Sequence, residues 1–241
     1  MPQFFIKDSD IKDSKATING DECYHLIKVR RAKLGDIIDI RTDSGRKFRA
    51  EIMSISTSYP EIRFKLFGEI EDDPKIIDIT LYMALLKSGN FEFVIQKSAE
   101  IGVNRIVPVH TSRTVPEIGG KIEDRHKRWN KIALNAAKQC LRYNVPSIEY
   151  ASDFFDAVKN CSAAVKLAGH PGARLELKNF LTQKDKPESV SILIGPEGGF
   201  SDSELDFASE HGWSIVNFGN TSLRAETAAI VIPSLIIYQW S

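Results

Sequence analysis

Two glycine-rich segments combine loop-forming residues with carboxylates. The first, residues 195–200 (GPEGGF), directly follows an apolar run of the kind that forms a buried strand. The second, residues 219–222 (GNTS), follows the apolar run 215–218 and precedes Glu226. Glycines let a ligand approach the backbone closely, and ligands of open parallel sheets bind at the carboxyl ends of the strands. The two loops therefore predict one binding site.

The carboxylates in these loops indicate which ligand would fit. Neither of the glycine fingerprints that hold nucleotide phosphates, GxxxxGK[ST] and GxGxxG, occurs in the sequence. Glu197 would repel a phosphate on the loop amides, so a neutral or cationic ligand fits better. A nucleoside-bearing ligand without phosphates is predicted. The alternatives are an ordinary strand-to-helix loop at 195–200 and dipole compensation by Glu226 at a helix start.

The elements that must position these loops alternate between strand and helix after residue 72. This alternation predicts an α/β domain, residues 73–241, with a parallel sheet covered on both faces. Ser201 and Glu204 have the spacing of a capping box, which predicts that the first loop opens a helix. The predicted strands are 76–86, 103–110, 163–168, 189–194 and 213–218. The predicted helices are 91–101, 122–143, 202–211 and 223–240.

Residues 1–72 have a different pattern, with short strands of period two. In residues 47–52 the side chains of Phe48, Ala50 and Ile52 alternate with charged ones, and residues 62–66 repeat this alternation. A third strand is predicted at 37–40, joined to the next through a turn at 43–45. Several such strands within 70 residues predict a small β-barrel.

Composition excludes several classes of protein. The 241 residues are 42% hydrophobic and 27% charged, which excludes a disordered chain. The N-terminal apolar patch is too short for a signal peptide, and the longest apolar run, 228–240, is too short to span a membrane. The three cysteines, Cys23, Cys140 and Cys161, form no CxxC pair, and the five histidines have no metal-ligand spacing. A cytoplasmic protein without a metal site is expected.

The zero net charge, 32 Lys and Arg against 32 Asp and Glu, is unevenly distributed. Residues 28–49 carry a local excess of five positive charges, and residues 121–142 carry the same excess. Residues 151–211, around the first loop, carry an excess of four negative charges. The neutral total, which by itself would disfavour a nucleic-acid binder, therefore conceals two basic regions that could contact phosphates.

The two loop segments, 194–201 (IGPEGGFS) and 223–228 (LRAETA), resemble those of the ribosomal RNA small subunit methyltransferase E family. Residues 95–103, 128–132 and 136–142 also fit that family's pattern, and residues 25–35 are similar to its N-terminal PUA-like barrel. The family methylates N3 of a uridine in 16S rRNA and belongs to the SPOUT superfamily. The resemblance implies a PUA-like RNA-binding barrel, a methyltransferase domain with a C-terminal trefoil knot, a homodimer, and an active site completed across its interface.

The resemblance also implies site residues. It places S-adenosylmethionine against the ends of three strands and the two loops, at Leu167, Ala168, Ile194, Gly195, Pro196, Glu197, Gly198, Gly199, Phe218, Gly219, Leu223, Arg224 and Ala228. It favours Arg142 for stabilising charge on the uracil and Glu197 for holding the donor or accepting a proton. Candidate RNA contacts are Arg30, Arg31 and Lys33 in the barrel, and Lys87, Lys97 and Arg113 in the larger domain.

Alternatives stay open for several of these residues. Asn135, Gln139 and Arg142 lie at i, i+4 and i+7, one stripe of the predicted helix, which a solvated polar face would also produce. Phe218 stands where the family usually has leucine. A non-catalytic RNA-binding factor of ribosome assembly is the alternative function, and a nucleotide-dependent dehydrogenase is disfavoured by the missing phosphate fingerprint.

Overall fold

The computed structural model describes residues 3–29, 31–42, 44, 46–56, 60–70, 77–114, 122–140, 142, 144–219 and 221–240. Contacts divide the chain into two compact units, Met1–Pro74 and Lys75–Ser241. The predicted boundary at residue 72 falls within residues 71–76, which lie outside the described ranges, as does most of the predicted turn at 43–45. Within the described ranges, no helix has both the length and the hydrophobicity needed to cross a bilayer.

The N-terminal unit is a six-stranded sheet around its own core. Its elements are β1 (Gln3–Ile6), η1 (Asp8–Asp10), β2 (Ile11–Lys12), β3 (Lys15–Asn19), α1 (Asp21–Tyr24), η2 (His25–Val29), β4 (Ile37–Thr42), β5 (Lys47–Ser56) and β6 (Glu61–Glu69). The strand order is β1-β4-β5-β6-β3-β2, antiparallel except for β1 and β4. Alternate residues of the strands, such as Ile40, Ile52 and Phe64, are buried in one core, as the period-two pattern predicts.

The C-terminal unit contains, in its described residues, a parallel sheet of eight strands. Its elements are β7 (Asp78–Ala84), α2 (Ser88–Ile101), β8 (Arg105–His110), α3 (Ile122–Gln139), β9 (Ser147–Ile148), β10 (Ser152–Asp153), α4 (Phe154–Lys159), β11 (Val165–Gly169), β12 (Leu175–Glu176), α5 (Leu177–Thr182), β13 (Ser189–Ile194), α6 (Asp202–Glu210), β14 (Ser214–Asn217) and α7 (Ala225–Trp240). The strands lie in the order β10-β8-β7-β13-β11-β14-β12, with β9 beside β8. Every pair in the sheet is parallel, as predicted.

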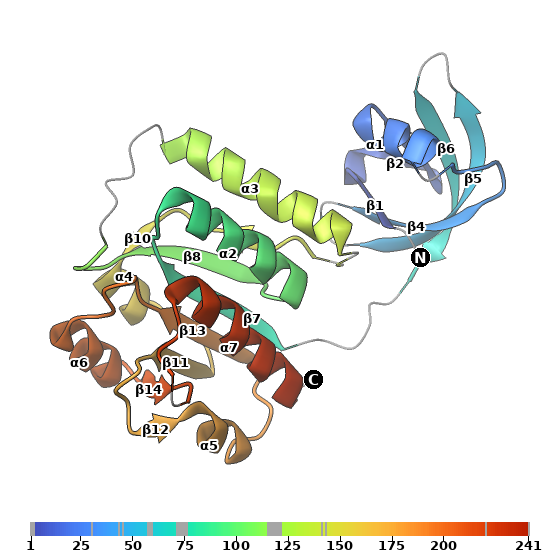
Figure 1. Ribbon diagram of the computed structural model, residues 1–241. Helices are drawn as coiled ribbons and strands as arrows, with labels where there is room; N and C mark the ends of the chain where they lie inside the picture. Colours follow the sequence, from blue (N-terminus) through green and yellow to red (C-terminus); the bar gives the residue numbers. More distant parts are fainter. Residues whose placement is uncertain are drawn as a thin grey trace. The chain divides into compact units, whose positions relative to one another are not determined.

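Helices cover both faces of this sheet (Figure 1). On one face α2, α3 and α7 pack together, and their buried residues join alternate strand residues such as Ile192 in one core. On the other face α4 and α6 pack together, and their buried residues form a second core with the intervening strand residues, such as Leu193. Because β13 is buried on both faces, its last three residues, 192–194 (ILI), are all apolar. Its predicted bounds, 189–194, are those observed.

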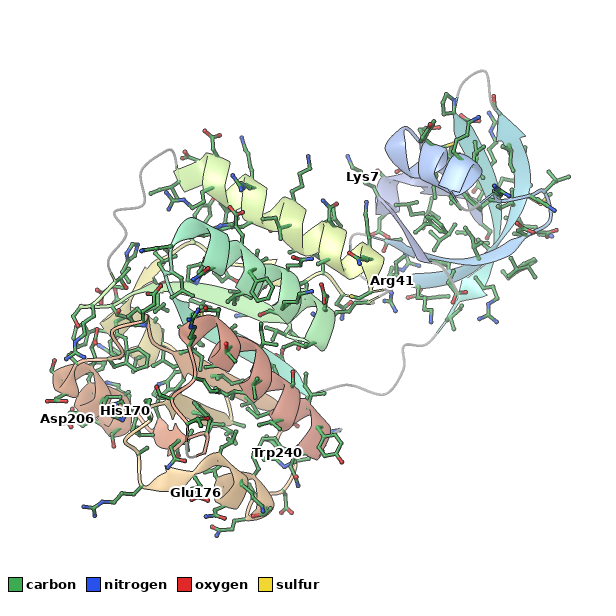
Figure 2. All side chains as sticks on the ribbon, in the orientation of Figure 1. Lys7, Arg41, His170, Glu176, Asp206 and Trp240 are labelled. Atoms are coloured by element: carbon green, nitrogen blue, oxygen red, sulfur yellow. The ribbon has the colours of Figure 1, made fainter. Side chains whose placement is uncertain are left out.

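The ends of other elements differ from the prediction. The long helix α3 ends at Gln139, four residues before the predicted end, and α7 begins at Ala225 rather than at 223. Trp240, labelled in Figure 2 at the end of α7, donates its indole N–H to the Lys184 carbonyl at 3.3 Å. This bond joins the last turn of α7 to the segment between α5 and β13.

Candidate functional site

A cavity of about 660 Å³ lies where β11, β13 and β14 end. Its volume is within the roughly 300–1,000 Å³ of small-molecule sites. Loops from all three strands form its wall, with the start of α7 and two residues from elsewhere, Asn90 and Arg113. Its position at the carboxyl ends of parallel strands is the one predicted from the sequence.

The first glycine loop links β13 to α6 and is held by its own hydrogen bonds. The Gly199 N–H donates to the Pro196 carbonyl at 2.8 Å, and Gly199 has a φ of +69°, a left-handed conformation that favours glycine. Ser201 caps α6, and the reciprocal bonds between Ser201 and Glu204 confirm the predicted capping box. The loop therefore presents Glu197 and Gly198 on a fixed backbone.

Glu204 also connects this loop to a segment 92 residues away. It is only 2% exposed, and it accepts bonds from the Ser112 N–H at 2.8 Å and the Ser112 hydroxyl at 3.0 Å. The same carboxylate accepts from the Ser201 N–H at 2.8 Å and the Ser201 hydroxyl at 3.0 Å. Four donors on one buried carboxylate fix the segment after β8 against the first glycine loop.

This clamp holds Arg113 at the cavity. Its guanidinium Nη1 donates to the Gly198 carbonyl at 2.8 Å, and its side chain lies 3.4 Å from where a Cβ at Gly198 would be. A guanidinium has five N–H donors, so this bond leaves others for a ligand. Arg113 was predicted as an RNA contact, and the structure places it in the wall of the cavity instead of on a separate surface.

The second glycine loop starts at the end of β14 and packs against the end of β11. The Gly219 N–H donates to the Asn217 side chain at 3.2 Å, and Gly219 has a φ of +117°. A Cβ added to Gly169 would lie 2.5 Å from the ring of Phe218, so any larger residue there would displace the ring. Phe218 and Gly219 line both this cavity and a second one of about 560 Å³.

The side chains of the cavity have mixed charge. Glu197 and Glu226 supply carboxylates, Arg113 and Arg224 supply guanidinium groups, and Phe218 with other apolar residues supplies a non-polar surface. This set suits a ligand with a cationic group, a carboxylate and an apolar or aromatic body. Among the described residues no group of His, Cys, Asp and Glu side chains could hold a metal ion.

Most residues predicted to hold the ligand line this cavity. They are Ile194, Gly195, Pro196, Glu197, Gly198, Gly199, Phe218, Gly219, Leu223, Arg224 and Ala228. The other two, Leu167 and Ala168, are fully buried in β11, and the next residues, Gly169 and His170, line the cavity in their place. The strand was predicted to end at 168, and β11 ends one residue later, at Gly169.

Arg142 lies elsewhere, and its predicted position on the helix is wrong. Because α3 ends at Gln139, Arg142 follows the helix instead of extending its polar stripe. Its guanidinium donates to the carbonyls of Ala99, Gly102 and Val103, at the C-terminal end of α2. Burial lowers the pKa of Arg142 to about 10, so the group stays charged at pH 7. Arg142 is not among the residues that line the cavity.

The predicted RNA contacts differ in their availability. Arg31, Lys33 and Lys87 are exposed, and Arg30 lies outside the described residues. Lys97 forms an ion pair with Glu100 at 2.8 Å on α2. Arg31, Lys33 and Lys87 are therefore free to approach a phosphate. Lys97 would first have to break its ion pair with Glu100.

The local positive charge of residues 28–49 is partly neutralised within the barrel. Arg46 pairs with Glu69 at 2.9 Å, and the buried carboxylate of Asp39 lies 3.2 Å from Arg49 and 3.8 Å from Lys47. Asp39 is already part of the count for residues 28–49, whereas Glu69 lies outside that range, so of these pairs the count misses only the neutralisation of Arg46.

Known proteins resemble this chain in both sequence and structure. The sequence model of a family described as RNA methyltransferase domain matches residues 73–237. The ribosomal RNA small subunit methyltransferase E of Mesomycoplasma hyopneumoniae is 37% identical over 71% of this chain and 73% of its own length. That of Buchnera aphidicola subsp. Acyrthosiphon pisum is 32% identical over 96% of this chain and 90% of its own. A Legionella pneumophila structure described as a methyltransferase in complex with the cofactor SAM is 27% identical, with a TM-score of 0.80, and covers 97% of this chain and 96% of its own.

These similarities agree with the fold and the family predicted from the loop segments. The parallel-sheet α/β unit preceded by a small β unit is confirmed by the likeness over nearly the whole chain. The trefoil knot stays a prediction. The chain belongs to the ribosomal RNA small subunit methyltransferase E family, and its residues 73–237 are an RNA methyltransferase domain.

Proposed function

We propose that this protein transfers a methyl group from S-adenosylmethionine to N3 of a uridine in 16S rRNA of the small ribosomal subunit. The observation that carries the proposal is the cavity of mixed charge at the ends of β11, β13 and β14, in a chain of this family. S-adenosylmethionine carries a sulfonium, an ammonium, a carboxylate and an adenosine without phosphates. These groups match the carboxylates, guanidinium groups and apolar residues of the cavity wall.

The two glycine loops and the end of β11 would hold this cofactor, with Leu167 and Ala168 supporting them from the core. When bound, the cofactor supplies an electrophilic methyl group on sulfur. Glu197 and Glu226 provide negative charge for its cationic groups, and Arg224 provides positive charge for its carboxylate. Phe218 and Ile194 provide apolar surface.

The remaining chemical problem is the proton on uracil N3. A neutral imide nitrogen is a poor nucleophile, so a base must take the proton, or the negative charge that spreads onto the flanking carbonyl oxygens must be stabilised. Glu197 is an exposed carboxylate at the cavity and is the candidate proton acceptor. Arg113, held by the Glu204 clamp, is the candidate for stabilising charge on a carbonyl oxygen.

Arg142 could serve the same task only if its guanidinium left the three carbonyls at the end of α2, or if it acted on the cavity of a second copy. We infer a homodimer from the family. The exposed apolar side chains of Phe93 on α2 and of Leu235 and Tyr238 on α7 support a face covered by protein, because α2 and α7 pack side by side. We place the reaction in the cytoplasm, where ribosomal subunits are the substrate.

Methyl transfer tests the function directly. The protein is incubated with radiolabelled S-adenosylmethionine and 30S subunits that lack the modification, and the rRNA is digested to nucleosides. Label in N3-methyluridine is expected, and subunits that already carry the modification are the control that should stay unlabelled. Binding to 30S subunits without cofactor binding in calorimetry, and without label, would instead support the non-catalytic assembly factor.

Replacing Gly169 by alanine should weaken cofactor binding. The added Cβ would overlap the Phe218 ring, which must then swing into the cavity or into its neighbour. To bind the cofactor, the protein would have to return the ring to its overpacked position, at a cost of about 1–3 kcal/mol, so a loss of affinity on the order of tenfold to a hundredfold is expected. Isothermal calorimetry measures it. The double variant Gly169→Ala/Phe218→Leu is the control, because a leucine removes the overlap and should restore most of the affinity.

A further inference from the structure

Three lysines stand opposite one another across three strands of the N-terminal sheet. Lys12 on β2 is the register partner of Lys15 on β3, and Lys15 is the register partner of Lys65 on β6. All three are exposed. Side chains at such positions have Cβ atoms about 4.5–5.5 Å apart, so three positive charges form a row across the sheet. We call Lys12, Lys15 and Lys65 the lysine row.

The fold holds this row together at a cost in stability. Like charges directly opposite each other destabilise a sheet. The turn between Lys12 and Lys15 consists of Asp13 and Ser14, with φ of 49° and 57°, a left-handed pair for which Asn-Gly or other glycine sequences are favoured. The turn is fixed by the Leu66 N–H, which donates to the Ser14 carbonyl at 2.8 Å.

Carboxylates lie near the row without forming ion pairs with it. In the part of the chain that the structure describes, no ion pair involves Lys12, Lys15 or Lys65. Glu51 on β5 is the register partner of Lys65, so one carboxylate stands opposite the end of the row, although no ion pair within 4 Å joins the two side chains. Asp10 accepts bonds from the Lys7 N–H and the Ser9 hydroxyl, both at 3.3 Å.

The row borders a groove with features of a nucleic-acid surface. A cavity of about 630 Å³ is lined by all three lysines, by Arg63 and by the exposed apolar side chain of Met53, together with the carboxylates Asp10 and Asp13. Arg63 is paired with Glu61 at 2.6 Å. Beside it the exposed ring of Phe67 lies 5.8 Å from the Lys65 ammonium. Cations next to exposed apolar and aromatic groups are typical of surfaces that bind single-stranded RNA.

We propose that the lysine row binds the phosphate backbone of RNA and so forms a contact surface separate from the predicted contacts Arg30, Arg31 and Lys33. A polyanion would relieve the repulsion among the three ammonium groups, which explains why a costly arrangement is kept. That the RNA is 16S rRNA rests on the proposed function. Phosphate contacts give affinity and register but no choice of sequence, so the row would bind RNA of any sequence.

The test compares full-length variants for binding to a labelled 30-nucleotide RNA of mixed sequence over a series of salt concentrations. The row variant is Lys12→Gln/Lys15→Gln/Lys65→Gln. Three phosphate contacts to a single strand contribute about 2 to the slope of log affinity against log salt, so the slope should fall by about 2, with affinity reduced tenfold or more at low salt. Lys159→Gln/Lys178→Gln/Lys186→Gln, which removes three exposed lysines of the other unit, should change both far less.

Melting temperature and a conservative variant separate binding from folding. Because the lysines repel one another, the row variant should melt at the same temperature as the wild type or higher. Arginine at all three positions should retain the RNA affinity. An unchanged salt slope, or a row variant that binds weakly because it melts early, would overturn the proposal. So would normal binding to RNA with weak binding to 30S subunits, which would indicate an acidic protein surface as the partner.

Methyl transfer and the salt series together distinguish a failure of this proposal from a failure of the proposed function. If the wild-type chain failed to methylate 30S subunits, the proposed function would fail, and the salt slopes would still decide whether the row binds phosphates. Calorimetry with S-adenosylmethionine should give the same affinity for the row variant and the wild type, since the row lies in the other compact unit.

Discussion

Replacing Arg113 by alanine is expected to lower kcat about 10²–10³-fold, while the Kd for S-adenosylmethionine changes by less than about threefold. Removing one donor that stabilises developing negative charge costs about this much in other enzymes. Arg113 comes from the segment after β8, and its bond to the Gly198 carbonyl is only one of the bonds that fix the first glycine loop. Its loss should therefore affect the transition state more than the bound donor. Single-turnover methyl transfer and calorimetry measure the two quantities.

Glu204 provides a second test of the same assignment, because it positions Arg113 through Ser112. In Glu204→Gln the side-chain NH2 group would take the place of Oε1 and face the Ser112 N–H, so one of the four hydrogen bonds would be lost. A smaller loss in kcat, about tenfold, is therefore expected. In an Arg113→Ala background the change should have little further effect, since the group it positions is gone. Glu210→Gln, an exposed residue of the same helix, is the matched control. Equal losses in kcat and in cofactor affinity for Arg113→Ala would contradict the assignment.

The sequence predicted the strands and loops that surround the cavity more accurately than the side chains that complete it. The first glycine loop, its strand and its capping box could be predicted because each depends on neighbouring residues. Arg113 could not be predicted as part of the cavity. It is brought there by Glu204, which bonds to a residue 92 positions away, and no local pattern encodes that distance.

Charge and helix ends were predicted less well for the same reason. Arg46 and Glu69 are 23 residues apart in the sequence but form an ion pair where β5 and β6 lie side by side. A local count of charges could not detect that Glu69 neutralises Arg46. The sequence pattern placed Arg142 on a polar stripe of α3, but the helix ends at Gln139, and periodicity alone does not show where a helix ends. The guanidinium of Arg142 reaches the end of α2, where it donates to the Gly102 carbonyl at 2.7 Å.

Replacing Arg142 by alanine is expected to lower the free energy of unfolding by about 2–4 kcal/mol. The guanidinium donates to the carbonyls of Ala99, Gly102 and Val103. Hydrogen bonds to a charged group contribute about 1.5–3 kcal/mol each, and in the variant water would bond to the freed carbonyls and offset part of this loss. A cation at a helix C-terminus also stabilises the helix dipole. For a chain of this size the melting temperature should fall by roughly 5–15 °C, measured by calorimetry or circular dichroism at pH 7.

The same variant separates a structural from a catalytic role for Arg142. If the guanidinium only holds the end of α2, kcat per folded molecule should stay near the wild-type value at a temperature where both chains are folded. A catalytic role predicts a loss of turnover with unchanged cofactor affinity. Arg105→Ala is the control, because the Arg105 ion pair with Glu149, at 3.9 Å and exposed, should contribute less than about 1 kcal/mol. Full stability of Arg142→Ala together with lost turnover would show that the carbonyls at α2 do not need the guanidinium, and that its charge acts on the substrate.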